Sequence, residues 1–102
     1  MKIYNKLVRD NIPKNIKSSG LSYKTRILDE EEYLKHLINK LLEEAKEVKD
    51  KPTKEELADV LEVLKHIAKR LNISMKDIEQ ERKRKKKANG GFVKKIFLIS
   101  TE

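Results

Sequence analysis

Apolar residues recur three and four positions apart along two long stretches of the chain. Each stretch opens with a helix-capping pattern, Asp-x-x-Glu at Asp29 and Thr-x-x-Glu at Thr53, and Pro52 ends the first. The pattern therefore predicts two amphipathic helices, and the short turn between them makes them antiparallel neighbours. The apolar positions are Leu34, Leu37, Ile38, Leu41, Leu42, Ala45 and Val48 in the first stretch, and Leu57, Val60, Leu61, Leu64, Ile67, Ala68 and Leu71 in the second.

The remaining segments predict smaller elements. A capping pattern at Ser74 begins a third helix that runs to about Ala88 and stops at Asn89-Gly-Gly91. Residues 23–28 and 92–99 are rich in β-prone residues and predict two short strands that pair. Residues 14–22 read as a loop, and residues 1–12 favour a short helix or an ordered arm equally. The expected fold is a single, mainly α domain over residues 1–102, with a helical hairpin, a third helix and a short β element.

Composition limits the classes of function. Only 37% of the 102 residues are hydrophobic and 41% are charged, which fits a hairpin with solvated faces or a fold completed by a partner chain. The absence of cysteine excludes disulfides and thiolate zinc sites. The longest apolar run, Ile96–Ile99, is too short to span a membrane, and the N-terminus lacks the apolar core of a signal peptide, so we expect a cytoplasmic protein without a membrane partner.

The net charge of +8 is unevenly distributed. Residues 29–65 carry twelve acids against seven bases, whereas residues 1–28 carry seven bases against Asp10 alone and residues 75–102 carry nine bases against four acids. An acidic centre between basic segments suits a metal–phosphate ligand, with the metal on the acids and the phosphate on the bases. It would equally suit nucleic-acid binding by the basic ends, although only 5% of residues are aromatic and no stacking platform lies beside the basic run.

Four carboxylates occupy matching heights on the predicted hairpin. Glu44 and Glu47 are spaced i, i+3 on the first helix, as are Glu56 and Asp59 on the second, so each pair shares a helix face. In two antiparallel helices, residues at the same height have residue numbers that add up to the same total. The numbers of Glu44 and Asp59 add up to the same total as those of Glu47 and Glu56, so the two pairs are expected to face each other across the hairpin. Four adjacent carboxylates repel one another unless a cation lies between them, and oxygen ligands favour Mg²⁺ or Mn²⁺.

Simpler explanations exist for the same residues. Glu56 is also the capping-box residue of its helix, and Glu44 and Glu47 have lysine partners, Lys40 and Lys51, four positions away. Glu43 faces away from the apolar stripe and is expected to be solvated. The basic run Arg82–Lys87 is either a solvated helix face or a phosphate contact, although helical spacing places Arg82 and Lys85 on the same side as Met75 and Ile78. His36 and His66 are expected on the polar surface.

Several motifs of the chain resemble one known family. Leu41-Leu-Glu-Glu-Ala-Lys-Glu-Val48 followed by Glu55-Glu-Leu-Ala-Asp-Val-Leu61 resembles the acidic signature of the all-α nucleoside triphosphate pyrophosphatase superfamily, which includes MazG-like and phosphoribosyl-ATP pyrophosphohydrolase-like proteins. Lys6-Leu-Val-Arg-Asp-Asn-Ile-Pro13, Ile27-Leu-Asp-Glu-Glu-Glu-Tyr33 and Asn89-Gly-Gly-Phe92 resemble motifs of a small, single-domain branch of it. The resemblance covers nearly the whole chain.

The resemblance implies cleavage of a nucleoside triphosphate, here a non-canonical one, between its α and β phosphates, giving a monophosphate and pyrophosphate. It implies Mg²⁺ held by Glu44, Glu47, Glu56 and Asp59, with Glu44 or Glu47 accepting a proton, and a homodimer or higher oligomer. It implies substrate contacts from Lys6, Arg9 and Asp10 at the N-terminus, and from Lys85 and Asn89 near the C-terminus. Asn89 stands where the branch often has Arg.

Two other functions remain open from the sequence. The same scaffold without turnover would be a nucleotide-binding or sequestering protein, and the departure at Asn89 leaves room for it. A basic nucleic-acid-binding helical module is the less favoured reading, and it would bind a duplex with a steep salt dependence even without the carboxylates.

Overall fold

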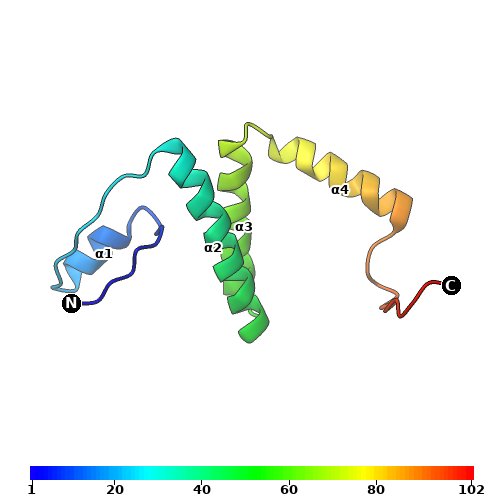
Figure 1. Ribbon diagram of the computed structural model, residues 1–102, viewed down its shortest axis with the longest axis horizontal. Helices are drawn as coiled ribbons and strands as arrows, with labels where there is room; N and C mark the ends of the chain where they lie inside the picture. Colours follow the sequence, from blue (N-terminus) through cyan, green and yellow to red (C-terminus); the bar gives the residue numbers. More distant parts are fainter.

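The computed structural model describes residues 1–102 and contains four helices and no strands (Figure 1). The helices α2 and α3 lie side by side as an antiparallel hairpin, with α1 and the N-terminus on one side and α4 projecting away on the other. The molecule is accordingly elongated, 59 × 31 × 26 Å. The expectation of a mainly α fold is confirmed. The helix bounds are Ile12–Ser18 for α1, Glu30–Asp50 for α2, Lys54–Arg70 for α3 and Met75–Asn89 for α4.

The start of each long helix is set by the capping side chain that the sequence predicts. The carboxylate of Asp29 accepts a hydrogen bond from the Glu32 amide at 2.8 Å, and the Glu32 carboxylate accepts one from the Asp29 amide at 3.3 Å. Thr53 and Ser74 accept from the amides three residues ahead of them, Glu56 and Asp77, at the starts of α3 and α4. Beyond the end of α4, Gly90 adopts the positive φ of 84° that glycine tolerates best.

The hairpin of α2 and α3 contains all of the buried residues of the chain. Leu37 of α2 and Val63 and Ala68 of α3 are its buried apolar residues. Arg70 donates to the Glu30 carbonyl and lies 3.1 Å from the Glu30 carboxylate, which ties the open end of the hairpin together. Only 4 of 102 residues are buried, so one copy of this chain encloses very little core.

The predicted apolar stripes are wider than the seam, and their other half is exposed. Ile38 and Leu42 of α2 and Leu57, Leu61 and Leu64 of α3 keep between 41% and 65% of their surface exposed. Because each residue advances a helix by about 100°, these five residues fall on the opposite side of the hairpin from Glu44 and Asp59. We call them the apolar face.

The short β element expected from residues 23–28 and 92–99 is absent. Both segments are irregular, and they lie on opposite sides of the hairpin (Figure 1), so their backbones are too far apart to exchange hydrogen bonds within one chain. The apolar side chains of the second segment are consequently exposed, Phe92 by 97% and Phe97 by 87%. The reading of residues 14–22 as a loop is also wrong in its first half, because Pro13 in the first turn of α1 pre-sets a helical φ.

Candidate functional site

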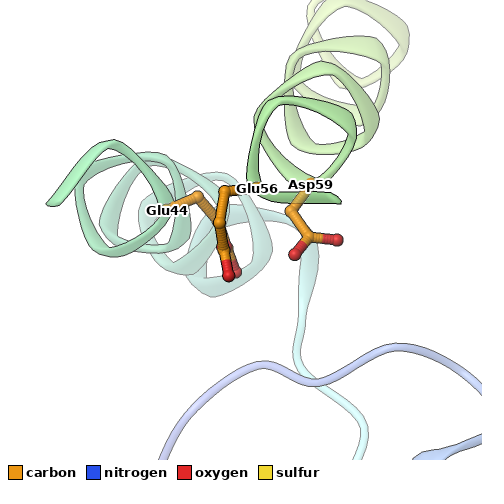
Figure 2. A group of neighbouring side chains, drawn as sticks. All are labelled: Glu44, Glu56 and Asp59. Carbon is orange, nitrogen blue, oxygen red and sulfur yellow. The ribbon is translucent and has the colours of Figure 1, made fainter. Parts of the chain in front are cut away.

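Three of the four predicted carboxylates meet across the hairpin. Glu44 projects from α2, and Glu56 and Asp59 project from α3 toward it (Figure 2). One oxygen from each carboxylate lies within 4.8 Å of the other two. The antiparallel register explains the meeting, because the turn at Pro52 sets Glu44 and Asp59 at the same height. We call these three residues the carboxylate cluster.

Two oxygens of the cluster are buried without a hydrogen-bond partner. Glu44 is only 7% exposed, and its Oε2 atom and the Oε2 atom of Glu56 have none. The other oxygen of Glu44, Oε1, lies 3.7 Å from the Nζ atom of Lys40, one turn away on the same helix. Burying a carboxylate oxygen without a partner costs free energy. A bound cation would remove that cost for both oxygens.

The capping role of Glu56 does not account for its carboxylate. Only half of the predicted capping box forms, since the Thr53 hydroxyl accepts from the Glu56 amide at 3.3 Å while the Glu56 side chain returns no bond to Thr53. The carboxylate is turned toward Glu44 instead (Figure 2). Capping therefore explains the position of the Glu56 backbone amide but not the position of its carboxylate.

Two carboxyl groups of the cluster, Glu44 and Glu56, have raised pKa values. Burial and the negative charge of Glu47 raise the pKa of Glu44 above its ordinary value, against the opposing effect of Lys40. The pKa of Glu56 is raised chiefly by a hydrogen bond with the Glu47 side chain, and further by burial and by the charges of Glu47 and Asp59. Glu47 is exposed and lies at the edge of the cluster, in contact with Glu56.

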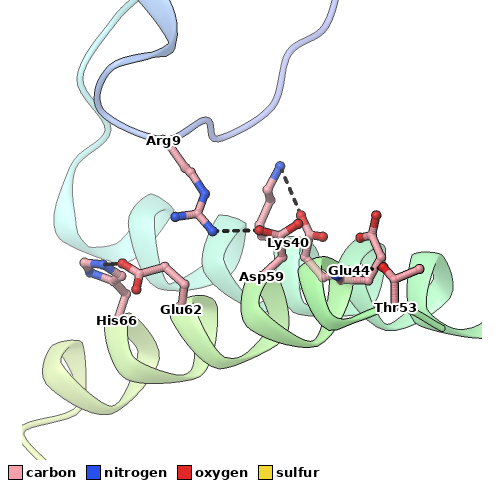
Figure 3. Close-up of polar contacts among 8 residues, drawn as sticks. Arg9, Lys40, Glu44, Thr53, Asp59, Glu62 and His66 are labelled. Atoms are coloured by element: carbon pink, nitrogen blue, oxygen red, sulfur yellow. Dashed lines mark hydrogen bonds and ion pairs between the residues drawn. The ribbon is translucent and has the colours of Figure 1, made fainter. Parts of the chain in front are cut away.

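The N-terminal arm, residues 6–11, crosses over the cluster. The guanidinium of Arg9 donates from Nη2 to Oδ1 of Asp59 at 2.7 Å (Figure 3). Lys6 instead lies 3.2 Å from Glu43, which also pairs with Lys40 at 3.6 Å. The expectation that Glu43 is merely solvated is wrong, because these two lysines hold it half-buried.

A cavity of about 370 Å³ lies between the arm and the hairpin, and the cluster lines one end of it through Glu44 and Asp59. Asp10, expected as a substrate contact, is on its wall. Lys40, Tyr33 and His66 also line the cavity, although the sequence predicted no role in a site for any of them. His66 was expected at the polar surface, and it is exposed, with Nε2 2.8 Å from a Glu62 oxygen. Of these residues, only Lys40 could have been assigned to the site from the sequence, because it lies four residues before Glu44 on the same helix.

The remaining two predicted contacts are far from the cluster. Lys85 and Asn89 belong to α4, which buries no residue and extends away from the hairpin (Figure 1). Helical spacing places Lys85 on the same side of α4 as Met75 and Ile78, as predicted. No other element packs against that side of α4, so Lys85 does not point into a site. Part of the basic run is paired within α4 itself, Arg82 with Glu79 and Arg84 with Glu81.

The donor set fits a hard divalent cation. All candidate ligand atoms are carboxylate oxygens, which Mg²⁺ and Mn²⁺ prefer over softer metals. Two of these oxygens are buried and unpartnered, as a metal ligand before metal binding would be. The cluster opens onto the cavity, so a ligand on the cation has space beside it.

Comparison of the chain with protein-family models, with curated proteins and with solved structures finds no match. None of the helices is long and apolar enough to cross a membrane.

The raised pKa values of Glu44 and Glu56 predict how stability depends on pH without metal. Each group binds its proton more tightly in the folded state than in the unfolded chain, so the folded state holds more protons above pH 4.5. The free energy of unfolding should then fall as pH rises from about 4.5 through the raised pKa values. Urea unfolding with chelator at several pH values measures it.

The matched variant is Glu44→Gln, which removes the Glu44 titration. Its stability should fall less than that of the wild type over the same pH interval. Saturating Mg²⁺ should flatten the wild-type curve, because a bound cation favours the deprotonated carboxylates. Parallel curves for wild type and variant would contradict the assignment of this titration to Glu44.

Proposed function

We propose that this protein is a metal-dependent nucleoside triphosphate pyrophosphohydrolase that cleaves between the α and β phosphates of a non-canonical nucleotide. The observation that carries the proposal is the buried, unpartnered Oε2 atom of Glu44 within a cluster of three carboxylates. The sequence resemblance to the all-α pyrophosphatase superfamily supplies the reaction. When bound, Mg²⁺ would neutralise the phosphate oxygens and orient the attacking water.

The acidic residues would have two roles, holding the cation and accepting a proton. Glu44, Glu56 and Asp59 would hold the cation. Glu47 would complete the ligand set or accept the proton of the water, and its contact with Glu56 and its exposure support that role. In an in-line displacement this proton leaves as the oxygen of the water bonds to the α-phosphorus and the bond to the β-phosphate oxygen breaks. Protonation of Glu56 would hinder the reaction, so turnover should need a pH at which the cluster is deprotonated.

Two basic side chains, Arg9 and Lys40, lie next to the carboxylate cluster and could contact the phosphates of a nucleotide bound there. Arg9 contacts Asp59 directly, and Lys40 lies between Glu43 and Glu44 with only 17% of its side chain exposed. We propose that the guanidinium of Arg9 neutralises Asp59 in the metal-free protein. Once a cation binds to Asp59, Arg9 would contact a phosphate of the nucleotide instead. Its guanidinium suits bidentate binding of phosphate oxygens.

Arg9→Ala should therefore have opposite effects on metal and nucleotide. Removing the pair with Asp59 should tighten Mn²⁺ binding, by up to about fivefold, since exposed ion pairs contribute about 0.2–1 kcal/mol. The same change should raise the KM for nucleotide. Calorimetry with Mn²⁺ alone and steady-state kinetics measure the two effects. Arg26→Ala is the control, because Arg26 pairs with Glu32. Weaker Mn²⁺ binding in Arg9→Ala would contradict the exchange.

A nucleotide panel tests the proposed function itself. The protein is incubated with canonical and modified nucleoside triphosphates in Mg²⁺ and in chelator, and pyrophosphate and orthophosphate are measured separately. We expect monophosphate and pyrophosphate from at least one nucleotide, only with metal, and none from Glu56→Gln at unchanged helicity. Orthophosphate as the product, or full activity in Glu56→Gln, would overturn it.

Nucleotide sequestration without turnover is the second candidate. The position of α4 favours it, because Lys85 and Asn89 lie away from the cluster and Asn89 replaces the Arg often found in the related branch. Metal-dependent nucleotide binding at equilibrium with no pyrophosphate released would select this function. Nucleic-acid binding by the basic segments has weaker support, and duplex binding that survives Glu56→Gln would select it.

We further propose that the active protein is a homodimer or higher oligomer. The apolar face is exposed on the side of the hairpin away from the cluster, and one copy buries only 4 residues. A second copy packed on the apolar face would bury it and leave the cluster and the arm open.

A further inference from the structure

The cavity under the N-terminal arm is larger than a cation and its phosphate ligands require. Its volume of about 370 Å³ lies within the range of about 300–1,000 Å³ common to small-molecule sites. Asp59, Val63 and His66 all line it, and they follow one face of α3 over two turns, about 10 Å along the helix axis. The cavity therefore continues from the carboxylate cluster toward the open end of the hairpin.

The walls beyond the cluster differ in chemistry from the cluster end. Leu37 and Val63 from the hairpin and Leu7 and Ile12 from the opposite side supply apolar surface. The basic side chains on the wall other than His66 are Arg9 and Lys40, and both contact the carboxylates. The other charged groups on the wall are the carboxylates of Asp10 and Glu62. An anionic group would therefore be disfavoured at the far end, whereas a flat, uncharged ring system could be covered by the apolar side chains there.

Two asparagines line the cavity at the start of α1. Asn11 directly precedes the helix and Asn15 follows four residues later, about one helical turn on. Asn11 precedes the helix but makes no side-chain capping hydrogen bond, so its amide is free for a ligand. A side-chain amide offers two donors and one acceptor, the combination that reads the polar edge of a nucleobase.

We propose that this cavity binds the base of the nucleotide, with Leu37 and Val63 against the ring and the amides of Asn11 and Asn15 on its polar edge. The inference rests on the proposed function, since it places the base relative to phosphates held at the cluster. Asn11 and Asn15 are then specificity-determining residues. The arm is required for the site because it carries Asn11 and the cavity wall at Leu7.

Binding of non-hydrolysable ligands with and without a base tests the inference. The ligands are inorganic tripolyphosphate and the α,β-methylene analogues of two canonical nucleotides, ATP and GTP, and two non-canonical ones, ITP and XTP, titrated in Mg²⁺ by calorimetry. At least one analogue should bind more tightly than tripolyphosphate. In the double variant Asn11→Ala/Asn15→Ala, the Kd of that analogue should rise about 5- to 150-fold, since two neutral hydrogen bonds to the base are lost.

The Kd values of tripolyphosphate and of Mn²⁺ should stay within about twofold of wild type in that variant. Asn39→Ala is the matched control, because Asn39 is exposed on α2 outside the cavity. Equal affinity of wild type for tripolyphosphate and all four analogues, or equal weakening of both ligand types in the double variant, would overturn the base site alone. No binding of Mn²⁺ or tripolyphosphate to the wild type would overturn the proposed function, and the base site with it.

Discussion

Glu44→Gln should abolish pyrophosphate release and metal binding, and it should make the metal-free protein more stable. Turnover is expected to fall roughly 10²- to 10⁴-fold, because the variant loses a buried charged ligand at the reacting phosphate. The free energy of unfolding in chelator at pH 7.5 is expected to rise by about 1–2 kcal/mol, since a buried carboxylate with one unpartnered oxygen is replaced by a neutral amide of the same shape. Lys40 keeps its second partner, Glu43.

A fall in turnover together with a rise in stability would distinguish a metal ligand from a glutamate with only a structural role. A structural residue would lose stability on replacement, and activity would fall only in proportion to unfolding. Glu43→Gln is the matched control, since Glu43 is the adjacent residue, pairs with Lys6 and lies outside the cluster. It should retain Mn²⁺ binding and most of its turnover. Calorimetry with Mn²⁺, kinetics and urea unfolding give the three readouts, and Mn²⁺ binding by Glu44→Gln at wild-type affinity would exclude the proposed site.

Leu61→Glu should break the proposed assembly and most of the fold with it. Leu61 is 50% exposed at the centre of the apolar face, between Leu57 and Leu64 one turn away on either side. A charge there would be buried against the second copy, which costs far more than the lost apolar contact. The expected results are a fall in molecular mass to that of the monomer and a loss of helical circular dichroism.

A milder variant keeps this prediction testable if Leu61→Glu does not fold. Leu61→Ala should lower the association constant while the chain still folds at high concentration. Ala58→Glu introduces the same charge on an exposed position of α3 outside the apolar face and should leave the mass unchanged. Light scattering and sedimentation measure the assembly. A wild-type protein that is a folded monomer at micromolar concentration would contradict it.

The hairpin and its carboxylates were predictable because they depend on local rules. Capping at Asp29 and Thr53 and the break at Pro52 fix where each helix begins and ends, and these bounds alone determine which residues stand at the same height. The cluster of Glu44, Glu56 and Asp59 follows from that register. Glu47 was expected as an equal member, but its side chain lies on the exposed edge.

The arm and the position of α4 were not predictable, since both depend on contacts between distant segments. Nothing in the periodicity of residues 6–11 indicates that Arg9 contacts Asp59, fifty positions away. Helical spacing likewise gives α4 an inner side at Met75 and Lys85 without indicating that this side meets no neighbour in the chain. The β-prone segments 23–28 and 92–99 had the right composition, but a strand needs a partner within reach, and α4 carries the second segment away.

Ion pairs attach the N-terminal arm to the hairpin, whereas apolar contacts hold the two helices of the hairpin together. Its polar anchors are the pairs of Lys6 with Glu43 and Arg9 with Asp59, and all four side chains keep at least a third of their surface in water. Exposed pairs of this kind are screened at physiological ionic strength over about 8 Å, whereas the apolar seam of α2 and α3 is not. Raising the ionic strength would thus weaken the contacts of the arm with the hairpin while α2 and α3 stay folded. The rate of ligand entry into the cavity would then depend on salt concentration and not on unfolding of the protein.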